Sequence, residues 1–314
     1  MKNTLYAIGE ALIDFIPDET GCGFGEVKSF SPKIGGAPAN VLGAFAKLGG
    51  KAQLITQLGD DLFGHKIAEN LKSFGIGTQN VKFTTDANTA LAFVSLDKDG
   101  NRTFSFYRNP SADMLYSGED LTEDVFGDCF ALHFCSVSLG EFPMKEAHKR
   151  AIELANKSGA IISFDPNIRL PLWKDTDSLK SAINEFLPFA DIIKVSDEET
   201  ELITGSGNID KACEKLLDYA KIVICTCGKN GACAYTKNSK VGAEPTNVAA
   251  KDTTGAGDAF IGSFLYSLHK NSFDKERLET INKKQLGEFI TASNNYCAKS
   301  VQRYGAIESY PDNL

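Results

Sequence analysis

The strongest constraint on the fold is a regular alternation, in the middle of the chain, between short apolar runs and longer amphipathic segments. Each run of four or five largely apolar residues is typical of a strand that is buried on both faces of a parallel sheet. Each intervening segment carries apolar residues at helical spacing. The expected strands are residues 131–135, 160–164, 192–195 and 222–226, and the expected helices between them are residues 144–157, 179–189 and 211–219. Right-handed crossovers then give an α/β fold, with a doubly wound, mostly parallel sheet, helices on both faces and ligands at the carboxyl ends of the strands.

The N-terminal third follows a different pattern, which predicts a small separate β-sheet. The candidate strands are residues 27–34, 89–96 and 102–107. Residues 97–101 read DKDGN, and Asp-Gly or Gly-Asn between β-rich runs is typical of a hairpin. Because these segments cannot all extend the parallel sheet, we expect them to cover the ligand cleft. The chain is therefore expected to be a single domain, residues 1–314, with a discontinuous β lid from about residues 12–34 and 88–112.

The charge and the composition exclude several classes of partner. The formal net charge is −8, the sequence pI is about 5.2, and no Lys/Arg block occurs, which argues against nucleic acid. No uncharged stretch approaches the roughly 18 apolar residues of a membrane span, and the N-terminus does not read as a secretion signal. The eight cysteines include no Cys-x-x-Cys pair. We therefore expect reduced thiols and a cytoplasmic location.

A glycine-rich turn near the C-terminus carries the clearest chemical signal. Residues 252–258 read DTTGAGD, and the apolar spacing after them predicts a helix over residues 258–269. The N–H groups at a helix start lack intrahelical partners, so such a turn can bind a phosphate or a developing oxyanion. A carboxylate at Asp258 could accept the proton of a nucleophile placed beside this anion hole. The ordinary alternative is a glycine-rich loop in which Asp258 only caps the helix.

The DTTGAGD run resembles the second signature of the ribokinase-like, or phosphofructokinase B type, carbohydrate kinases. Residues 35–40, GGAPAN, with residues 59–64, GDDLFG, resemble the first signature of that family. The two signatures lie about 200 residues apart in the family's order, and the resemblance spans essentially the whole chain. It implies an α/β domain with a β lid. It also implies that Asp258 is the catalytic base and that the N–H groups of Gly255, Ala256, Gly257 and Asp258 form the anion hole.

By the same resemblance, the sugar hydroxyls would be held by Asp14, Gly35, Gly36, Asn40 and Asp258. We expect Asp14 at the end of the first strand, where a buried carboxylate needs hydrogen bonds of the kind that a polyol supplies. A strand-end turn residue is the ordinary alternative for Asp14, and a helix-start residue is the alternative for Asn40.

Two further segments resemble fructokinases within the family. Residues 106–113, FYRNPSAD, are similar to a lid segment whose arginine, here Arg108, would reach the substrate in a forked contact. Asn167 and Arg169 belong to DPNIR at residues 165–169 and would meet substrate or phosphate at a strand end. A solvated arginine is the alternative for Arg169.

The nucleotide side is implied by three elements of the family. Ser196 and Glu199 match an Asn-x-x-Glu element that organises Mg²⁺ through water, although Ser replaces the usual Asn. Glu199 could equally be a solvated helix residue among its acidic neighbours. The loop at residues 226–231 would bring Thr226, Gly228 and Gly231 to ATP. Gly257 would also contact the nucleotide, and Asn294 would border the adenine.

Members of the family often bind K⁺ beside the anion hole through backbone oxygens. A weaker expectation is therefore a K⁺ site at the matching positions, which are Asp252, Thr254, Ser300, Arg303, Gly305 and Ser309.

These observations together predict an enzyme, a phosphotransferase that moves the γ-phosphoryl group of ATP to a sugar hydroxyl. The resemblance is closest to fructokinases, which convert D-fructose to fructose 6-phosphate. A 2-keto-3-deoxygluconate kinase or a riboside kinase is the alternative within the family, and a non-catalytic sugar or nucleotide sensor is the alternative outside it. An exposed lid sheet favours a homodimer, although its edges can also be covered within one chain.

Overall fold

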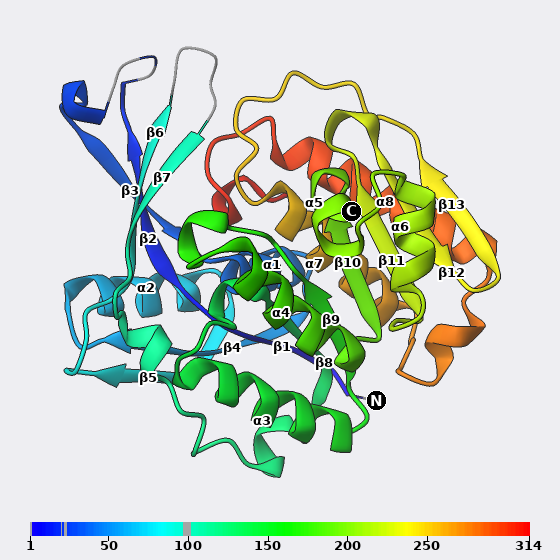
Figure 1. Ribbon diagram of the computed structural model, residues 1–314, viewed down its shortest axis with the longest axis horizontal. Helices are drawn as coiled ribbons and strands as arrows, with labels where there is room; N and C mark the ends of the chain where they lie inside the picture. The colour runs from blue at the N-terminus through cyan, green and yellow to red at the C-terminus, as the bar shows by residue number, and fades with distance from the viewer. Residues whose placement is uncertain (1, 20, 22–23, 97–101) are drawn as a thin grey trace.

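A large twisted sheet forms the centre of the protein (Figure 1). The computed structural model describes residues 2–19, 21, 24–96 and 102–314. Within these residues, nine strands lie in the order β13-β12-β11-β10-β9-β8-β1-β4-β5, paired in parallel except that β12 pairs antiparallel with β11 and β13. The strands are β1 (Thr4–Ile8), β4 (Lys51–Gly59), β5 (Ile76–Thr84), β8 (Cys129–Cys135), β9 (Ile161–Asp165), β10 (Ile192–Ser196), β11 (Ile222–Thr226), β12 (Ala232–Thr236) and β13 (Ser239–Ala243). The expected mostly parallel sheet is confirmed.

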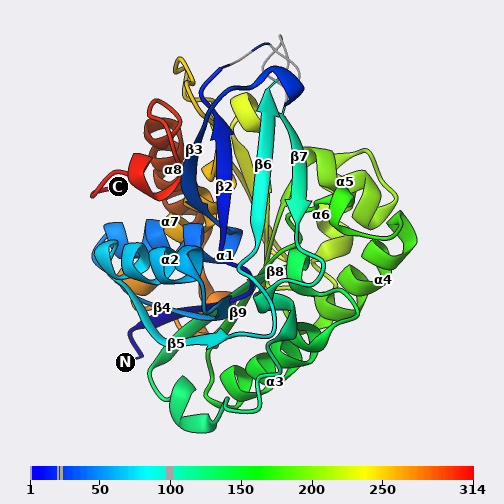
Figure 2. The same ribbon diagram turned by 90° about the vertical axis from the view of Figure 1, so that its left-hand side faces the viewer.

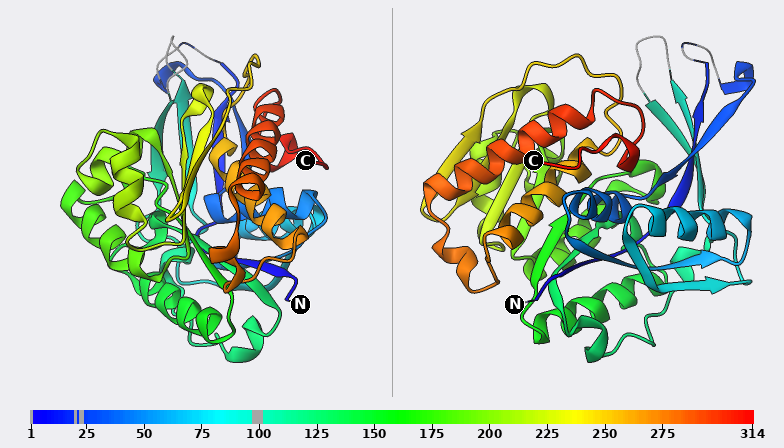
Figure 3. Two further views of the ribbon diagram at one scale, coloured as in Figure 1. Left: turned by 90° about the vertical axis from the view of Figure 1, so that its right-hand side faces the viewer. Right: turned by 180° about the vertical axis from the view of Figure 1, so that it is seen from behind.

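Helices cover both faces of this sheet, as Figures 2 and 3 show from three sides. One face carries α1 (Ala37–Lys47), α2 (Leu62–Ser73), α7 (Ala256–Lys270) and α8 (Lys283–Ser300). The other carries α3 (Pro143–Lys157), α4 (Thr176–Phe186), α5 (Asp197–Thr204) and α6 (Ile209–Leu216). Successive strand residues point to opposite faces, so Ile161 packs into one apolar core and Ile162 into the other. Because helices cover both faces of the sheet, residues on both faces of such a strand are buried, and the strand is largely apolar along its whole length.

Two helices start earlier than expected, each at a residue whose side chain caps the helix. Helix α4 starts earlier than residue 179 because Asp175 accepts a hydrogen bond from the Ser178 N–H at 2.7 Å. Helix α6 starts earlier than residue 211 because Asn208 accepts one from the Lys211 N–H at 3.0 Å. Such caps satisfy N–H groups that the first turn leaves without partners, and apolar spacing does not reveal them.

The smaller sheet rises from one end of the layered body, as Figures 1 and 2 show. Its strand order is β3-β2-β6-β7, with β2 (Leu12–Pro17), β3 (Phe30–Gly35), β6 (Leu91–Leu96) and β7 (Arg102–Tyr107). The expected separate sheet is thus confirmed, and β6 pairs antiparallel with β7 as a hairpin requires. The expected turn at residues 97–101 lies outside the described residues.

The chain passes from the large sheet to the small sheet at two points, between β1 and β2 and between β5 and β6. Gly9, Glu10 and Ala11 separate β1 from β2, so Asp14 lies inside a strand of the small sheet, and our prediction that it ends the first strand is wrong. At the second change, Asp61 caps α2 and accepts hydrogen bonds from the Thr89 N–H and hydroxyl at 2.8 and 2.9 Å. Asp61 of the GDDLFG segment therefore holds the chain in place just before β6 begins.

Among the helices that the structure describes, none combines the length and apolar character that a membrane crossing requires.

Candidate active site

The DTTGAGD turn joins the large sheet to the start of α7. Gly255 is the N-cap of α7 and has a left-handed backbone with φ of 70°. A Cβ on Gly255 would lie 2.4 Å from the Tyr310 hydroxyl oxygen and 2.8 Å from the Ala306 Cβ, so glycine is required for both conformation and space. The Ala256 N–H already donates to the Thr253 carbonyl at 3.2 Å. Of the four N–H groups that were expected to form an anion hole, the one of Ala256 is therefore already engaged, and those of Gly255, Gly257 and Asp258 remain as candidates.

Asp258 is buried in the first turn of α7 and faces Asn40 of α1. Its Oδ2 accepts a hydrogen bond from Asn40 Nδ2 at 2.9 Å. The pKa of Asp258 is raised to about 6, chiefly by burial and also by the charge of Asp165, and the Asn40 contact, Lys194 and Arg169 partly offset this rise. A carboxyl with a pKa near neutrality is ionised at pH 7 and still basic enough to accept a proton.

A cavity of about 270 Å³ separates this carboxylate from the small sheet, and we call it the lid cavity. Asn40 contributes a buried Oδ1 that has no hydrogen-bond partner in the described part of the chain. Such an atom needs a donor, which a ligand hydroxyl would supply. The remaining lining comes from the small sheet, the start of α1, the segments that follow β1, β8 and β9, and the DTTGAGD turn. It includes Glu10, Leu12, Asp14, Gly36, Phe104, Phe106, Val137, Asn167, Arg169 and Leu172.

A second cavity, of about 570 Å³, opens at the carboxyl ends of β9, β10 and β11, and we call it the strand-end cavity. Glu199 links two segments of its wall, because its carboxylate accepts hydrogen bonds from the Ile168 N–H at 2.7 Å and the Ser196 N–H at 2.8 Å. Its lining includes the predicted residues Asn167, Arg169, Ser196, Glu199, Thr226, Gly228 and Gly257. The topology thus brings these separate sequence elements to one place.

A third cavity, of about 260 Å³, lies between α8 and residues 246–253, and we call it the loop cavity. Asn294 lines it and donates to the Glu244 carbonyl at 3.0 Å and to the Thr246 hydroxyl at 3.1 Å. Thr253 lines all three cavities, which places the DTTGAGD turn at their common junction. The three cavities therefore form one connected site. It can hold a small polar ligand in the lid cavity and a longer ligand across the other two, with the DTTGAGD turn between them.

Comparison with known proteins decides the family. Residues 2–313 match the profile described as pfkB family carbohydrate kinase. The chain belongs to this family of carbohydrate kinases. It is similar to probable fructokinase-5 of Arabidopsis thaliana, with 43% identity over 99% of this chain and 96% of that protein. A fructokinase from Xylella fastidiosa with bound ATP matches with a TM-score of 0.91 and 32% identity, over 99% of this chain and 96% of that one.

A further similar structure holds more ligands. It is a double mutant of the fructokinase from Vibrio cholerae O395 in a form with fructose, ADP and potassium ion bound. It matches with a TM-score of 0.86 and 30% identity, and the match covers 99% of this chain and 96% of that one.

The C-terminal segment of the kinase packs against the turn, where the K⁺ site was expected. Asp252 Oδ1 accepts hydrogen bonds from the N–H and hydroxyl of Thr254 at 2.9 and 2.6 Å, and Asp252 Oδ2 accepts one from the Gly305 N–H at 2.9 Å. The Tyr310 hydroxyl donates to the Gly255 carbonyl at 2.9 Å. Ser300, Arg303 and Ser309 lie in the same segment. The six predicted positions therefore lie on two segments that contact each other beside the anion hole.

Apart from residues of the predicted K⁺ site, three predicted residues of the kinase lie off the walls of the three cavities. Arg108 is buried, and its guanidinium donates to the Asp113 carboxylate, the Val137 carbonyl and the Ser138 hydroxyl. The predicted forked contact is thus made to Asp113, because a buried guanidinium needs a buried counter-charge. Gly35 leaves room for Asp14, whose Oδ2 would lie 2.1 Å from a Cβ on Gly35.

Gly231, the third of these residues, closes the turn of the nucleotide loop. It has φ of 88°, its carbonyl accepts a hydrogen bond from the Cys227 N–H at 2.8 Å, and a Cβ there would lie 2.2 Å from the Ala243 carbonyl oxygen. Its role in the described structure is to shape the loop that presents Gly228.

Two buried charged residues at the site were not predicted. Glu10 lines the lid cavity, and its carboxylate accepts hydrogen bonds from the Ser138 hydroxyl at 2.9 Å and the Ala37 N–H at 3.3 Å. Lys194 lines the strand-end cavity from inside an apolar strand. A charged residue within an otherwise apolar strand is the sequence signal that could have identified Lys194.

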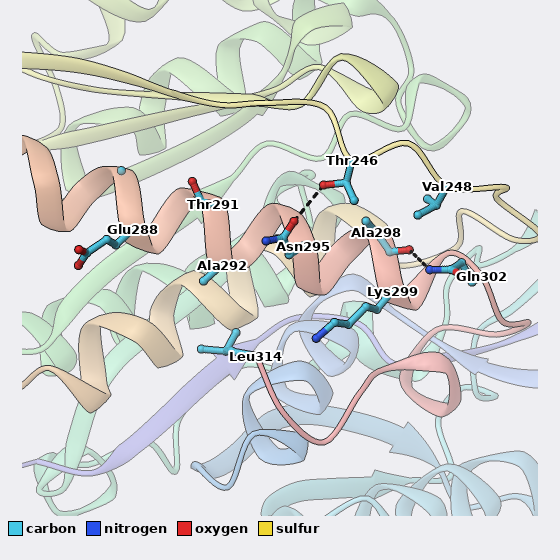
Figure 4. A pocket seen from close by; sticks show the side chains of 11 residues that line it. Thr246, Val248, Glu288, Thr291, Ala292, Asn295, Ala298, Lys299, Gln302 and Leu314 are labelled. Atoms are coloured by element: carbon cyan, nitrogen blue, oxygen red, sulfur yellow. Dashed lines mark hydrogen bonds between the residues drawn. The ribbon is translucent and has the colours of Figure 1, made fainter.

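A larger groove of about 720 Å³ runs along the outer side of α8 (Figure 4). A hydrogen bond from the Thr246 hydroxyl to Asn295 Oδ1, at 3.0 Å, crosses its upper edge, and Lys299 and Leu314 lie along it. The groove contains none of the predicted site residues and is separate from the lid and strand-end cavities.

Proposed function

We propose that this carbohydrate kinase transfers the γ-phosphoryl group of ATP to a hydroxyl of D-fructose and forms fructose 6-phosphate. The observation that carries the proposal is the pairing of Asp258 with Asn40 at the wall of a small polar cavity. The fructokinase names of the similar proteins support the choice of fructose, including one structure with bound fructose.

The lid cavity suits the sugar. Its volume of about 270 Å³ accommodates a monosaccharide, and the buried Asn40 Oδ1 offers an acceptor to a hydroxyl. Asp14 projects from the small sheet into the same cavity. Asp258 would take the proton of the attacking hydroxyl as its oxygen bonds to phosphorus, and the helix-start N–H groups would hold the charge on the transferred group.

The strand-end and loop cavities suit ATP. We place the phosphates in the strand-end cavity beside Gly257, and the adenosine in the loop cavity beside Asn294 and Gly228. Mg²⁺ would neutralise charge on the phosphates, and Glu199 would hold it through water, because both its carboxylate oxygens already accept backbone N–H groups. In the described residues no group of three or more His, Cys, Asp or Glu side chains could hold a metal, which suits an ion carried largely by phosphate and water.

The predicted K⁺ site is part of the proposal. Carbonyl and carboxylate oxygens suit a hard monovalent cation, and the segments of residues 252–254 and 300–309 contact each other next to the anion hole. A cation there would add positive charge near the transferred group. The potassium-bound structure of a similar fructokinase supports this assignment.

We further propose that residues 1–314 act as one unit, with the small sheet as a lid, and that two copies pair through this sheet. Phe93 contacts the rings of Phe15, Phe24, Phe30 and Tyr107 on the sheet face opposite Asp14. Phe24 is 49% exposed and Tyr107 62% exposed, so a partner sheet would bury apolar surface. Sedimentation equilibrium should give twice the 34.0 kDa chain mass, and a monomer at micromolar concentration would contradict pairing.

A cytoplasmic location completes the proposal. The cysteines within the described residues all carry free thiols, and most of them are buried, as is usual in a reducing compartment.

An ADP-release assay tests the proposed function directly. With ATP and Mg²⁺, fructose is expected to give the highest kcat/KM in a panel that includes ribose, 2-keto-3-deoxygluconate and nucleosides. Repeating the fructose assay with K⁺ replaced by a large organic cation tests the cation site, and lower activity is expected. A preference for another sugar would favour the alternative kinases, and sugar binding without ADP release would favour a sensor.

A further inference from the structure

Lys194 is a charged residue in a place where charges are rare. It is the third residue of β10, between Ile193 and Val195, which are fully buried. Its own exposed fraction is 6%. Burying an ammonium costs several kcal/mol unless it finds acceptors or counter-charges, so a lysine here needs a specific reason.

One contact of Lys194 is an ion pair on the neighbouring strand. Its Nζ donates to Asp165 Oδ2 at 2.9 Å, and Asp165 is 1% exposed. An ammonium has three N–H donors. In residues 2–19, 21, 24–96 and 102–314 the Asp165 contact is the one hydrogen bond that Nζ makes, which leaves two donors for a ligand.

The free side of the ammonium faces the strand-end cavity. Lys194 lines this cavity, and a Cβ added to Gly257 would lie 2.9 Å from Nζ and 3.7 Å from Cε. The ammonium therefore lies directly beside the backbone of the anion hole. The absence of a side chain at Gly257 keeps the space between the turn and the ammonium open.

The surrounding charges keep the ammonium protonated. Burial lowers the pKa of Lys194, but the carboxylates of Asp165, Glu199 and Asp258 outweigh it and raise that pKa above its ordinary value. Lys194 is therefore a fixed positive charge that interacts electrostatically with the carboxylates of both Asp258 and Glu199.

We propose that Lys194 contacts the terminal phosphoryl group of the nucleotide and stabilises its negative charge during transfer. This inference rests on the proposed function and adds a catalytic residue to it. In the step, the sugar oxygen forms a bond to phosphorus, its proton passes to Asp258, and the bond from phosphorus to ADP breaks with the electron pair leaving on ADP. Lys194 remains protonated throughout, and its free donors hold equatorial oxygens of the moving group.

The Lys194→Met variant tests this role, because methionine keeps much of the volume and removes the charge. We expect kcat to fall by about 10²-fold or more, the loss typical of one transition-state donor, with the sugar KM changed by less than about threefold. The matched control is Lys275→Met, which removes a lysine from another buried carboxylate, Asp191 at 2.8 Å, outside the three cavities. Its kcat should equal that of the wild type.

A double variant separates phosphate contact from simple neutralisation of Asp165. In Lys194→Met alone, Asp165 is left as an unpaired buried charge, which could disturb the turn by itself. Asp165→Asn combined with Lys194→Met removes both charges. If Lys194 acts on the phosphoryl group, the double variant stays as slow as the single one. Recovery of kcat to near the wild-type value would overturn the proposal.

Nucleotide titration gives a readout that does not depend on the sugar. By calorimetry, the double variant should bind a non-hydrolysable ATP analogue at least about tenfold more weakly than the wild type, as the loss of a charged hydrogen bond implies. Its affinity for ADP should change by less than about threefold. Equal losses for both nucleotides, or no loss, would overturn the role of Lys194. A wild-type protein that phosphorylates no sugar would instead contradict the proposed function and leave this titration valid.

Discussion

Replacing Asp258 with asparagine is expected to lower kcat by about 10²–10⁴-fold, the contribution of a positioned general base. Asparagine keeps the size of the side chain and can still contact Asn40, so the geometry of the turn should survive. It cannot accept the proton of the sugar hydroxyl. The measurement is the initial rate of ADP release at saturating fructose and ATP.

The matched control for this variant is Asp191→Asn. Asp191 is also a buried carboxylate, with lysine partners, but it lies outside the three cavities. Its kcat per folded molecule should equal that of the wild type. Turnover of Asp258→Asn within a few-fold of the wild type would exclude Asp258 as the base.

The pH dependence follows from the same carboxyl. Because the pKa of Asp258 is about 6 and the ionised form accepts the proton, kcat/KM should fall about tenfold per pH unit below pH 6. The folded pKa lies above the ordinary value of 3.8, so the charged form costs folding free energy, and this cost appears as the pH rises from about 4 to about 6. Asp258→Asn removes the cost, and its Tm at pH 8 should be no lower than that of the wild type.

The fold could be predicted because its strands are apolar in an unbroken run. Residues such as Ile161 and Ile162 are both buried, on opposite faces, and this pattern has few solutions other than a parallel sheet between helices. The ends of the helices were harder to predict from the sequence, because a capping residue such as Asp175 acts only in a particular local backbone conformation. The position of Asp14 was also inaccessible, since the break at residues 9–11 depends on how β2 pairs with β3.

The site residues that belong to short motifs could be predicted from the sequence. Those whose role depends on an ion pair formed in the folded chain were harder to predict. The DTTGAGD turn and Asn40 come together as the two signatures imply, through one hydrogen bond between α1 and α7. Arg108 had an acceptor five residues away, Asp113, and motif resemblance alone could not decide between that partner and a substrate. Lys194 belongs to none of the motifs, and its importance depends on Asp165 and Gly257, which only the folded chain brings to it.

Gly255→Ala is the second change for which we expect a large effect, on both stability and rate. Alanine at φ of 70° costs roughly 1–2 kcal/mol, and its Cβ would also meet the Tyr310 hydroxyl oxygen at 2.4 Å. Overpacking of this kind adds about 1–3 kcal/mol, so we expect a loss of about 2–5 kcal/mol in the free energy of unfolding, measured by urea titration. Since the clash displaces the donors of the anion hole, kcat should fall by about 10²-fold.

The Gly159→Ala variant measures separately how much stability is lost through the left-handed backbone conformation alone. Gly159 has a similar φ of 74°, but an added Cβ there meets nothing within 4 Å, and the residue lies in the turn after α3. The variant should lose only the roughly 1–2 kcal/mol of the left-handed conformation, with an unchanged kcat. If Gly255→Ala lost no more stability and no more activity than Gly159→Ala, the contact with Tyr310 would not hold the turn. A larger loss in kcat for Gly255→Ala, measured on fully folded protein, would instead mean that phosphoryl transfer depends on where the turn places its N–H groups.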